Sequence, residues 1–281
     1  MVAPKFEHIY GVDFSGAKLA GENIWIAQLE RRRGKVELVQ LDRLRSLCGT
    51  AERSTALAFL VEFVAITHRA LWGMDFPFGL PIEVLPSEAV WVDQLRFASK
   101  WNEAYALGME CVRRAKALGG PMHIRRTTDT EAKTPFDCYQ YRIIYQTFHG
   151  MRDVLMPLSE VPGTAILPFQ YRRLASARRV VVEACPGSTL KRMGLPHQNY
   201  KQSHGGPITP GRLRTRRAIL EGLGNEVVIS AAHRRVIMRN RGGDALDAVI
   251  AAVGTLHGYN AANHAEIAMH ARYPREGRLY V

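Results

Sequence analysis

The stretch HIYGVDFSGA, from His8 to Ala17, indicates how the fold begins and where its chemistry lies. Its first part is typical of an apolar strand, and the strand ends in Asp13, which the small and turn-prone residues Phe-Ser-Gly follow. A buried carboxylate costs roughly several kcal/mol unless a turn, a basic side chain or a metal ion pairs with it. Asp13 therefore needs a partner, and the rest of the chain has to supply it.

The segments that follow predict two more strands, a helix and a fourth strand. ENIWIAQLE (22–30) and KVELVQLDRL (35–44) alternate apolar and polar residues, so the first three strands are expected to form a meander. TAERSTALAFLVEFVAITHRA (50–70) has helical spacing, with Thr50 as its expected cap. The apolar run RALWGMDFPFGLP (69–81) then contains Asp75.

The middle of the chain has a different pattern. Residues 86–175 are mainly amphipathic and helical, with a polar loop RRTTDTEAKTPFD (125–137), and are expected to form a helical insertion that caps the domain. RRVVVEACPGSTL (178–190) predicts a buried strand that ends at Glu183. We therefore expect a single α/β domain over residues 1–281 that contains this insertion.

The last third predicts two helices after a Gly/Pro-rich loop. These helices are RTRRAILEGL (214–223) and GGDALDAVIAAVGTLHGYN (242–260). Asp244 and Asp247 stand at the start of the second helix, three residues apart, so that helix directs both to one face.

The acidic residues at these element ends suggest a metal site. Asp13, Asp75 and Glu183 each follow an apolar strand, and the carboxyl ends of parallel strands share one edge of a sheet. If Asp244 and Asp247 pack on that edge, five carboxylates converge. Two such charges 4 Å apart repel by about 4 kcal/mol at an effective dielectric near 20, so a divalent cation is expected among them. Oxygen-only ligands favour Mg²⁺ or Mn²⁺.

The composition of the chain indicates which binding partners and which cellular compartment to expect. The 281 residues carry 38 Lys and Arg against 26 Asp and Glu, and most of the positive charge is arginine, which favours nucleic acid or phosphorylated ligands. No apolar run approaches the roughly 20 residues of a membrane span, and the N-terminal segment lacks the pattern of a signal peptide. The expected location is the cytoplasm, without a membrane partner. Four separated cysteines without a C-x-x-C pair argue against a zinc ribbon.

Five motifs carry a family resemblance. GVDFSGA, GMDFPFGLP, VEACPGSTLKRMGLPHQNYK, GGDALDAVIAA and the terminal REGRLYV together resemble the family called domain of unknown function 429, regarded as ribonuclease H-like nucleases. The Asp-Ala-Leu-Asp pair is also similar to the last acidic pair of RuvC-type resolvases. The resemblance implies a mixed five-stranded sheet flanked by helices, and Mg²⁺ held by carboxylates.

The same resemblance implies a hydrolase that cuts the phosphodiester bonds of nucleic acid. Two metal ions would activate water and stabilise the leaving oxygen, with Asp13 bridging them. Asp75, Glu183, Asp244 and Asp247 would complete the metal shells. Lys201 would contact phosphate, and Tyr200 would stack on the substrate or position it. His197 could shuttle protons.

Simpler interpretations compete with this site. Asp13 could accept hydrogen bonds from Ser15 and Gly16 in an Asx-turn, and Asp244 could be a helix N-cap. His197, Tyr200 and Lys201 could be ordinary loop surface.

Two other functions also stay open. GVDFSGA is similar to the first phosphate loop of actin-like sugar kinases, although 281 residues without a repeat are few for the two copies of the fold that such phosphotransferases need. A non-catalytic nucleic-acid-binding module would keep the fold and use only the arginine surface.

Overall fold

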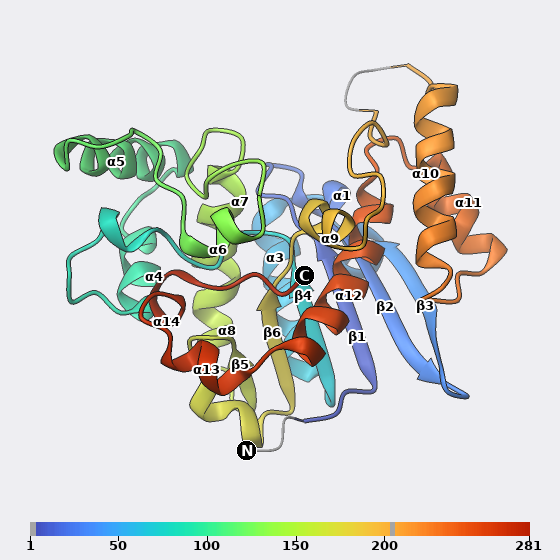
Figure 1. Cartoon of the computed structure of the whole chain (residues 1–281), viewed down its shortest axis with the longest axis horizontal. Helices are drawn as coiled ribbons and strands as arrows, with labels where there is room; N and C mark the ends of the chain where they lie inside the picture. The colour runs from blue at the N-terminus through green and yellow to red at the C-terminus, as the bar shows by residue number, and fades with distance from the viewer. Residues whose placement is uncertain (1–3, 203–205) are drawn as a thin grey trace.

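A mixed sheet runs through the centre of the molecule. The protein is described by a computed structural model for residues 4–202 and 206–281. In these ranges the sheet has six strands in the order β3-β2-β1-β4-β6-β5 (Figure 1). The strands are β1 (His8–Asp13), β2 (Trp25–Arg32), β3 (Lys35–Arg43), β4 (Ala70–Met74), β5 (Thr164–Ile166) and β6 (Arg179–Glu183). The first three form an antiparallel meander, whereas β4, β6 and β5 continue the sheet parallel to β1.

The expected number of five strands was wrong, because β5 adds a sixth at the edge. Its three residues, Thr164–Ile166, are all buried and pair in parallel with β6. They lie inside the segment 86–175, for which we expected mainly helices. A run of three residues is too short to have a readable period, so only its pairing with β6 identifies it as a strand.

One face of the sheet is covered by α12 (Asp244–Ala261), which packs across β1, β2 and β4. The helix backbone comes so close to β1 that a Cβ on Gly11 would lie 2.1 Å from the carbonyl oxygen of Ala248. This close packing therefore requires small residues on both elements, alanine on α12 and glycine on β1, because any larger side chain would push the helix off the sheet. This contact carries Asp247, in the first turn of α12, to the end of β1.

The opposite face is covered by α3 (Arg53–Ile66) and by helices of the 86–175 segment. Trp72 and Met74 of β4 share one core with Leu57 of α3 and with Phe148. The N-cap of α3 is Glu52, whose carboxylate accepts hydrogen bonds from the backbone N–H groups of Ser54 and Thr55. The expected cap Thr50 was wrong; its hydroxyl instead accepts from the N–H of Glu52, at the turn before the helix.

The segment 86–175 is mainly helical apart from β5, and part of it packs directly on the sheet. Its elements are α4 (Trp91–Ser99), α5 (Ala104–Ala117), α6 (Thr127–Glu131), α7 (Ile144–His149), a π-helical turn η2 (Gly150–Leu155), α8 (Met156–Glu160) and a 3₁₀ turn η3 (Tyr171–Ser176). Met151 and Leu155 of η2 lie in the same core as Trp72. By contrast, α5 lies at the outer edge of the molecule (Figure 1).

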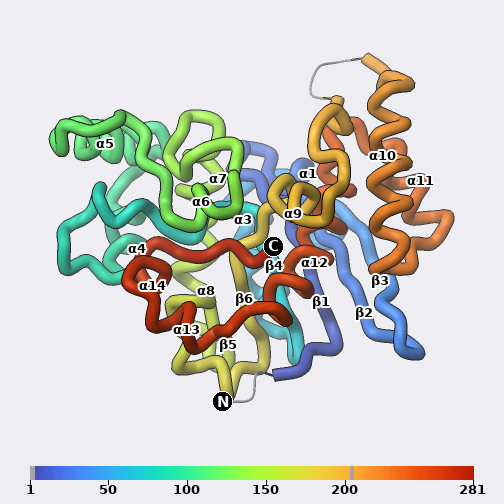
Figure 2. Tube along the Cα trace, viewed as in Figure 1, coloured from blue at the N-terminus to red at the C-terminus, as the bar shows by residue number. Residues whose placement is uncertain are grey.

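The remaining helices are short, except for two that lie at the opposite edge from α5. The short elements are α1 (Ala20–Asn23), α2 (Leu44–Cys48), η1 (Ile82–Val84), α9 (Pro186–Arg192), α13 (His264–Met269) and α14 (Tyr273–Glu276). Figure 2 shows α10 (Pro210–Leu223) and α11 (Ala231–Arg239) side by side near β3. The turn between them is tied to β3, because Val228 exchanges backbone hydrogen bonds with Val36 and Leu38. In the described ranges, no helix has the length and apolar character needed to cross a membrane.

Candidate active site

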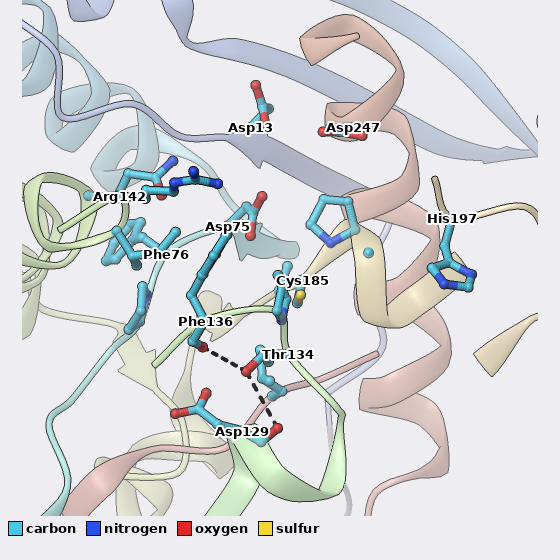
Figure 3. A pocket seen from close by; sticks show the side chains of 18 of the residues that line it. Asp13, Asp75, Phe76, Asp129, Thr134, Phe136, Arg142, Cys185, His197 and Asp247 are labelled. Carbon is cyan, nitrogen blue, oxygen red and sulfur yellow. Dashed lines mark hydrogen bonds between the residues drawn. The ribbon is translucent and has the colours of Figure 1, made fainter. Parts of the chain in front are cut away.

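A pocket of about 930 Å³ lies at the carboxyl ends of β1, β4 and β6. Of the residues that the sequence suggested for the site, those that line it are Asp13, Asp75, Glu183, Lys201 and Asp247. Figure 3 shows Asp13, Asp75 and Asp247 near one another and Asp129 at the other side of the pocket. Asp244 does not line the pocket, although its charge acts on Asp13. Tyr200 and His197, which the sequence also suggested, line the pocket as well, so the structure brings seven of the eight suggested residues to one cavity.

Asp13 and Asp75 are placed by adjacent parallel strands. Asp13 is the last residue of β1, and the backbone N–H of Asp75 donates to the carbonyl of Val12 in the same strand. The alternative Asx-turn at Asp13 does not form, because among the described residues its carboxylate accepts no hydrogen bond. The hydroxyl of Ser15 makes the local turn contact instead, with the N–H of Ala17.

The carboxyls of this cluster hold their protons more tightly than usual. Burial, and then the charges of Asp247, Asp244 and Asp75, raise the pKa of Asp13 well above its ordinary value, although Lys201 acts against this. Burial and the charge of Asp247 raise the pKa of Asp75 to about 7. Burial also raises the pKa of Asp244. Burial and mutual repulsion therefore both favour the neutral form of these carboxyls in the absence of a further cation.

Two residues of the loop HQNYK hold Asp247. The phenol of buried Tyr200 donates a hydrogen bond of 2.8 Å to Asp247, and the ammonium of Lys201 forms an ion pair with the same carboxylate. Desolvation alone would lower the pKa of Lys201, but Asp247 and Asp13 outweigh it and raise that pKa well above its ordinary value. The alternative of ordinary loop surface is therefore wrong for Tyr200, and His197 from the same loop also lines the pocket.

Asp244 is the first residue of α12, and the N-cap is Gly243. The alternative role of Asp244 as an N-cap was therefore wrong by one position. Gly243 has a φ of 88°, a left-handed conformation that glycine adopts without strain, and it turns the chain into the helix.

Glu183 has a different partner from the other carboxylates. Two guanidinium nitrogens of Arg126 lie 2.6 and 2.8 Å from its oxygens, and the N–H of Phe78 donates to it at 3.0 Å. Arg126 is 1% exposed and also binds Asp129, at 2.8 and 3.0 Å. Both oxygens of Glu183 are thus engaged in a buried ion-pair network that forms one wall of the pocket.

Sequence reasoning missed Arg126, because its segment was interpreted as a polar loop. The available signal was the spacing of Arg126 and Asp129, which are three residues apart at the start of α6 and form an ion pair there. Arg142 and Arg212 also line the pocket and were not singled out. Arg142 and His197 lie on opposite sides of the carboxylates in Figure 3.

The terminal motif REGRLYV closes the same wall. The carboxylate of Glu276 accepts from the N–H of Thr127, and the N–H of Tyr280 donates to the carbonyl of Glu183. Gly277 has a φ of 96°, and a Cβ there would lie 3.1 Å from both Arg126 and Glu183. The glycine is required because the chain must pass close to this ion pair in a left-handed conformation.

The donor atoms fit a hard divalent cation. Asp13, Asp75 and Asp247 offer only carboxylate oxygens, the type of ligand that Mg²⁺ and Mn²⁺ prefer. Lys201 now supplies the compensating charge beside Asp247. Within the described parts of the chain, no three His, Cys, Asp or Glu side chains are grouped closely enough to hold an ion as they stand.

Comparison with known proteins adds no relative. No protein-family model, no curated protein and no solved structure matches this chain.

The raised pKa of Asp75 predicts how stability depends on pH. In the folded protein this carboxyl keeps its proton up to about pH 7, whereas in the unfolded chain it loses the proton near its ordinary pKa of 3.8. The contribution of Asp75 to the free energy of unfolding is therefore complete below about pH 4 and disappears as pH rises through 7. Without metal, the loss is on the order of 2–4 kcal/mol. Asp75→Asn should remove this part of the pH dependence in urea unfolding curves. Asp93→Asn, at a half-buried position outside the pocket, is the control, and an unchanged slope in Asp75→Asn would contradict the prediction.

Proposed function

We propose that the protein hydrolyses phosphodiester bonds in nucleic acid with the help of Mg²⁺ or Mn²⁺. The observation that carries this proposal is the convergence of Asp13, Asp75, Asp247 and Lys201 in one pocket with arginines on its wall. We propose further that the fold is ribonuclease H-like and of the domain of unknown function 429 kind. The antiparallel meander β1-β2-β3, followed by parallel strands, supports that assignment.

The basic residues of the pocket suit a phosphate ligand. Arg142 donates to the hydroxyl of Tyr141, and Arg212 donates to the carbonyl of Lys201. Neither guanidinium forms an ion pair with a carboxylate of the described residues, so both keep their charge available for an anion. Guanidinium groups match phosphate oxygens geometrically, and a cavity of about 930 Å³ lies in the range for small-molecule or nucleotide sites.

Asp13, Asp75 and Asp247 would hold the metal, and a bound Mg²⁺ would lower the pKa of water and neutralise charge on the reacting phosphate. Tyr200 fixes the orientation of Asp247 through its hydroxyl. Lys201 balances the carboxylates and reaches the same cavity, where its ammonium would contact a phosphate oxygen. His197 would accept or donate a proton at its imidazole.

Glu183 would act on this site indirectly. Its oxygens bind Arg126, so it positions the wall that carries Arg126 and the C-terminal segment. We therefore propose three aspartates as metal ligands and Glu183 as a positioning residue. Asp244, three residues before Asp247 on α12, would act on the site through its charge, which raises the pKa of Asp13.

The experiment uses labelled single-stranded, duplex and branched DNA and RNA, with Mg²⁺, with Mn²⁺ and with chelator. We expect cleavage only when metal is present, together with a higher melting temperature, because a ligand at 100 times its Kd stabilises the folded state by about 2.7 kcal/mol. Calorimetry measures the metal affinity directly. A protein that cuts none of these substrates and whose melting temperature ignores both metals would not be a nuclease, and the binding module would then remain.

A further inference from the structure

Half of the net positive charge of the chain lies in the segment that contains α10 and α11. Residues 207–243 contain eight arginines and two glutamates, a net charge of +6 out of the +12 of the whole chain. The pocket uses only Arg212 of these. The exposed arginines of the segment are Arg214, Arg217, Arg235, Arg239 and Arg241.

In the described part of the chain, these exposed arginines have no acidic partner. None of them forms an ion pair with a carboxylate within residues 4–202 and 206–281. Arginines elsewhere on the surface are often paired locally: Arg32 binds Glu30 at 2.8 Å, and Arg113 binds Glu110 at 2.7 Å. The unpaired guanidinium groups of the segment 207–243 give the two neighbouring helices a positive potential that attracts a polyanion, and its exposed arginines are here named the arginine surface.

Buried Arg216 makes the two helices one unit. It donates hydrogen bonds to the carbonyls of Ile237, Asn240 and Arg241, at the end of α11 and just beyond it. It also donates to the carbonyl of Tyr200, at 2.7 Å. The arginine surface of α10 and α11 is therefore tied to the loop whose Tyr200 and Lys201 hold Asp247.

The same surface begins at the pocket. Arg212 lies in the first turn of α10, lines the pocket and donates to the carbonyl of Lys201. From there α10 leads away from the pocket, with α11 beside it at the edge of the molecule (Figures 1 and 2). A long anion that occupies the pocket can thus continue along these helices.

We propose that the exposed arginines of α10 and α11 bind the sugar-phosphate backbone of a nucleic acid whose reacting phosphodiester lies in the pocket. This inference rests on the proposed function for the identity of the ligand. Arginine contacts to phosphate do not depend on base sequence. The arginine surface therefore contributes affinity for the nucleic acid and fixes its position, whereas the phosphodiester is hydrolysed in the pocket.

The test is the variant Arg214→Gln/Arg217→Gln/Arg235→Gln, with binding of labelled DNA and RNA measured in chelator over a salt series. We expect at least a tenfold loss of affinity and a fall of about 2 to 3 in the slope of log K against log salt. The matching Arg→Lys variant should keep the slope. Both should melt like the parent protein, because the three side chains are exposed.

The control removes the same charge elsewhere. Arg172→Gln/Arg173→Gln/Arg178→Gln changes exposed residues of η3 and of the segment before β6, at the β5 edge of the sheet, which is the edge opposite β3 and the two helices. Its affinity and slope should stay close to those of the parent. An equal loss in the control, an unchanged slope in the α10–α11 variant, or equally tight binding of poly-glutamate would overturn the inference.

The outcomes separate this inference from the proposed function. If the parent binds nucleic acid through these arginines but never cuts it, the nuclease proposal fails and the binding surface stands. If the parent cuts and the α10–α11 variant binds as well as the parent, only the surface is wrong. A parent that binds neither DNA nor RNA contradicts both.

Discussion

Asp13→Asn is expected to lower the rate of nucleic-acid cleavage by about a thousandfold or more, and to weaken Mg²⁺ binding. The amide keeps the shape of the side chain but removes the charge at the end of β1. The fold should survive, because the carboxylate accepts no hydrogen bond among the described residues. Without metal the variant should be as stable as the parent or slightly more stable. Removing the carboxylate of Asp13 relieves its repulsion with Asp247, Asp244 and Asp75. Single-turnover cleavage and melting curves with and without Mg²⁺ measure these effects.

Asp42→Asn is the matched control for this prediction. Asp42 lies on β3, does not line the pocket and accepts a hydrogen bond from Gln40, which an amide oxygen can also accept. Its variant should cut and bind metal like the parent. If Asp13→Asn kept the parent rate and the parent metal affinity, Asp13 would be a structural residue and the metal site would lie elsewhere.

Arg126→Met is expected to lower the free energy of unfolding by about 3–5 kcal/mol, because it leaves Glu183 and Asp129 buried without their cation. In a chain of 281 residues this corresponds to a fall in melting temperature of roughly 10 °C. The variant should regain part of this stability as pH falls, since burial already raises the pKa of Glu183 and Arg126 no longer opposes it. Urea unfolding between pH 5 and 8 measures both effects.

Arg125→Met is the control for this experiment, because Arg125 is exposed and its guanidinium binds the carbonyls of Thr134 and Pro135. Its cost should be about 1 kcal/mol or less. The double variant Arg126→Met/Glu183→Met should be more stable than Arg126→Met alone, since no charge at position 183 is then buried without a partner. An Arg126→Met protein that unfolds like the parent at every pH would mean that the network does not support the fold.

The local patterns predicted the elements that carry the pocket. The apolar runs before Asp13, Asp75 and Glu183 predicted β1, β4 and β6, because buried strands have continuous apolar residues and a carboxylate at the end interrupts them. The alanines after Asp247 predicted the buried helix α12. Because parallel strands end at one edge, the same patterns also predicted that these acidic residues come together.

Other features depended on contacts between distant segments. Arg126 lies 57 residues before Glu183, and Thr127 lies 149 residues before Glu276, so no local period links these partners. The strand β5 is recognisable only by its pairing with β6. The cap Glu52 differs from the expected Thr50 because the geometry of the helix start decides which side chain reaches the free N–H groups.

The sequence by itself thus determined the α/β class, the order of the main elements and the positions of the carboxylates, because each follows from the period and the end of one segment. Only the tertiary structure decided which cation each carboxylate meets: Lys201 for Asp247 and Arg126 for Glu183. The physical reason is that electrostatic partners are chosen by proximity and burial in three dimensions, and the sequence does not encode these as a spacing. For the same reason, five acidic residues that look equivalent in the sequence divide into three aspartates that line the pocket near Lys201, one glutamate bound to Arg126 in its wall, and Asp244, which is not among the lining residues.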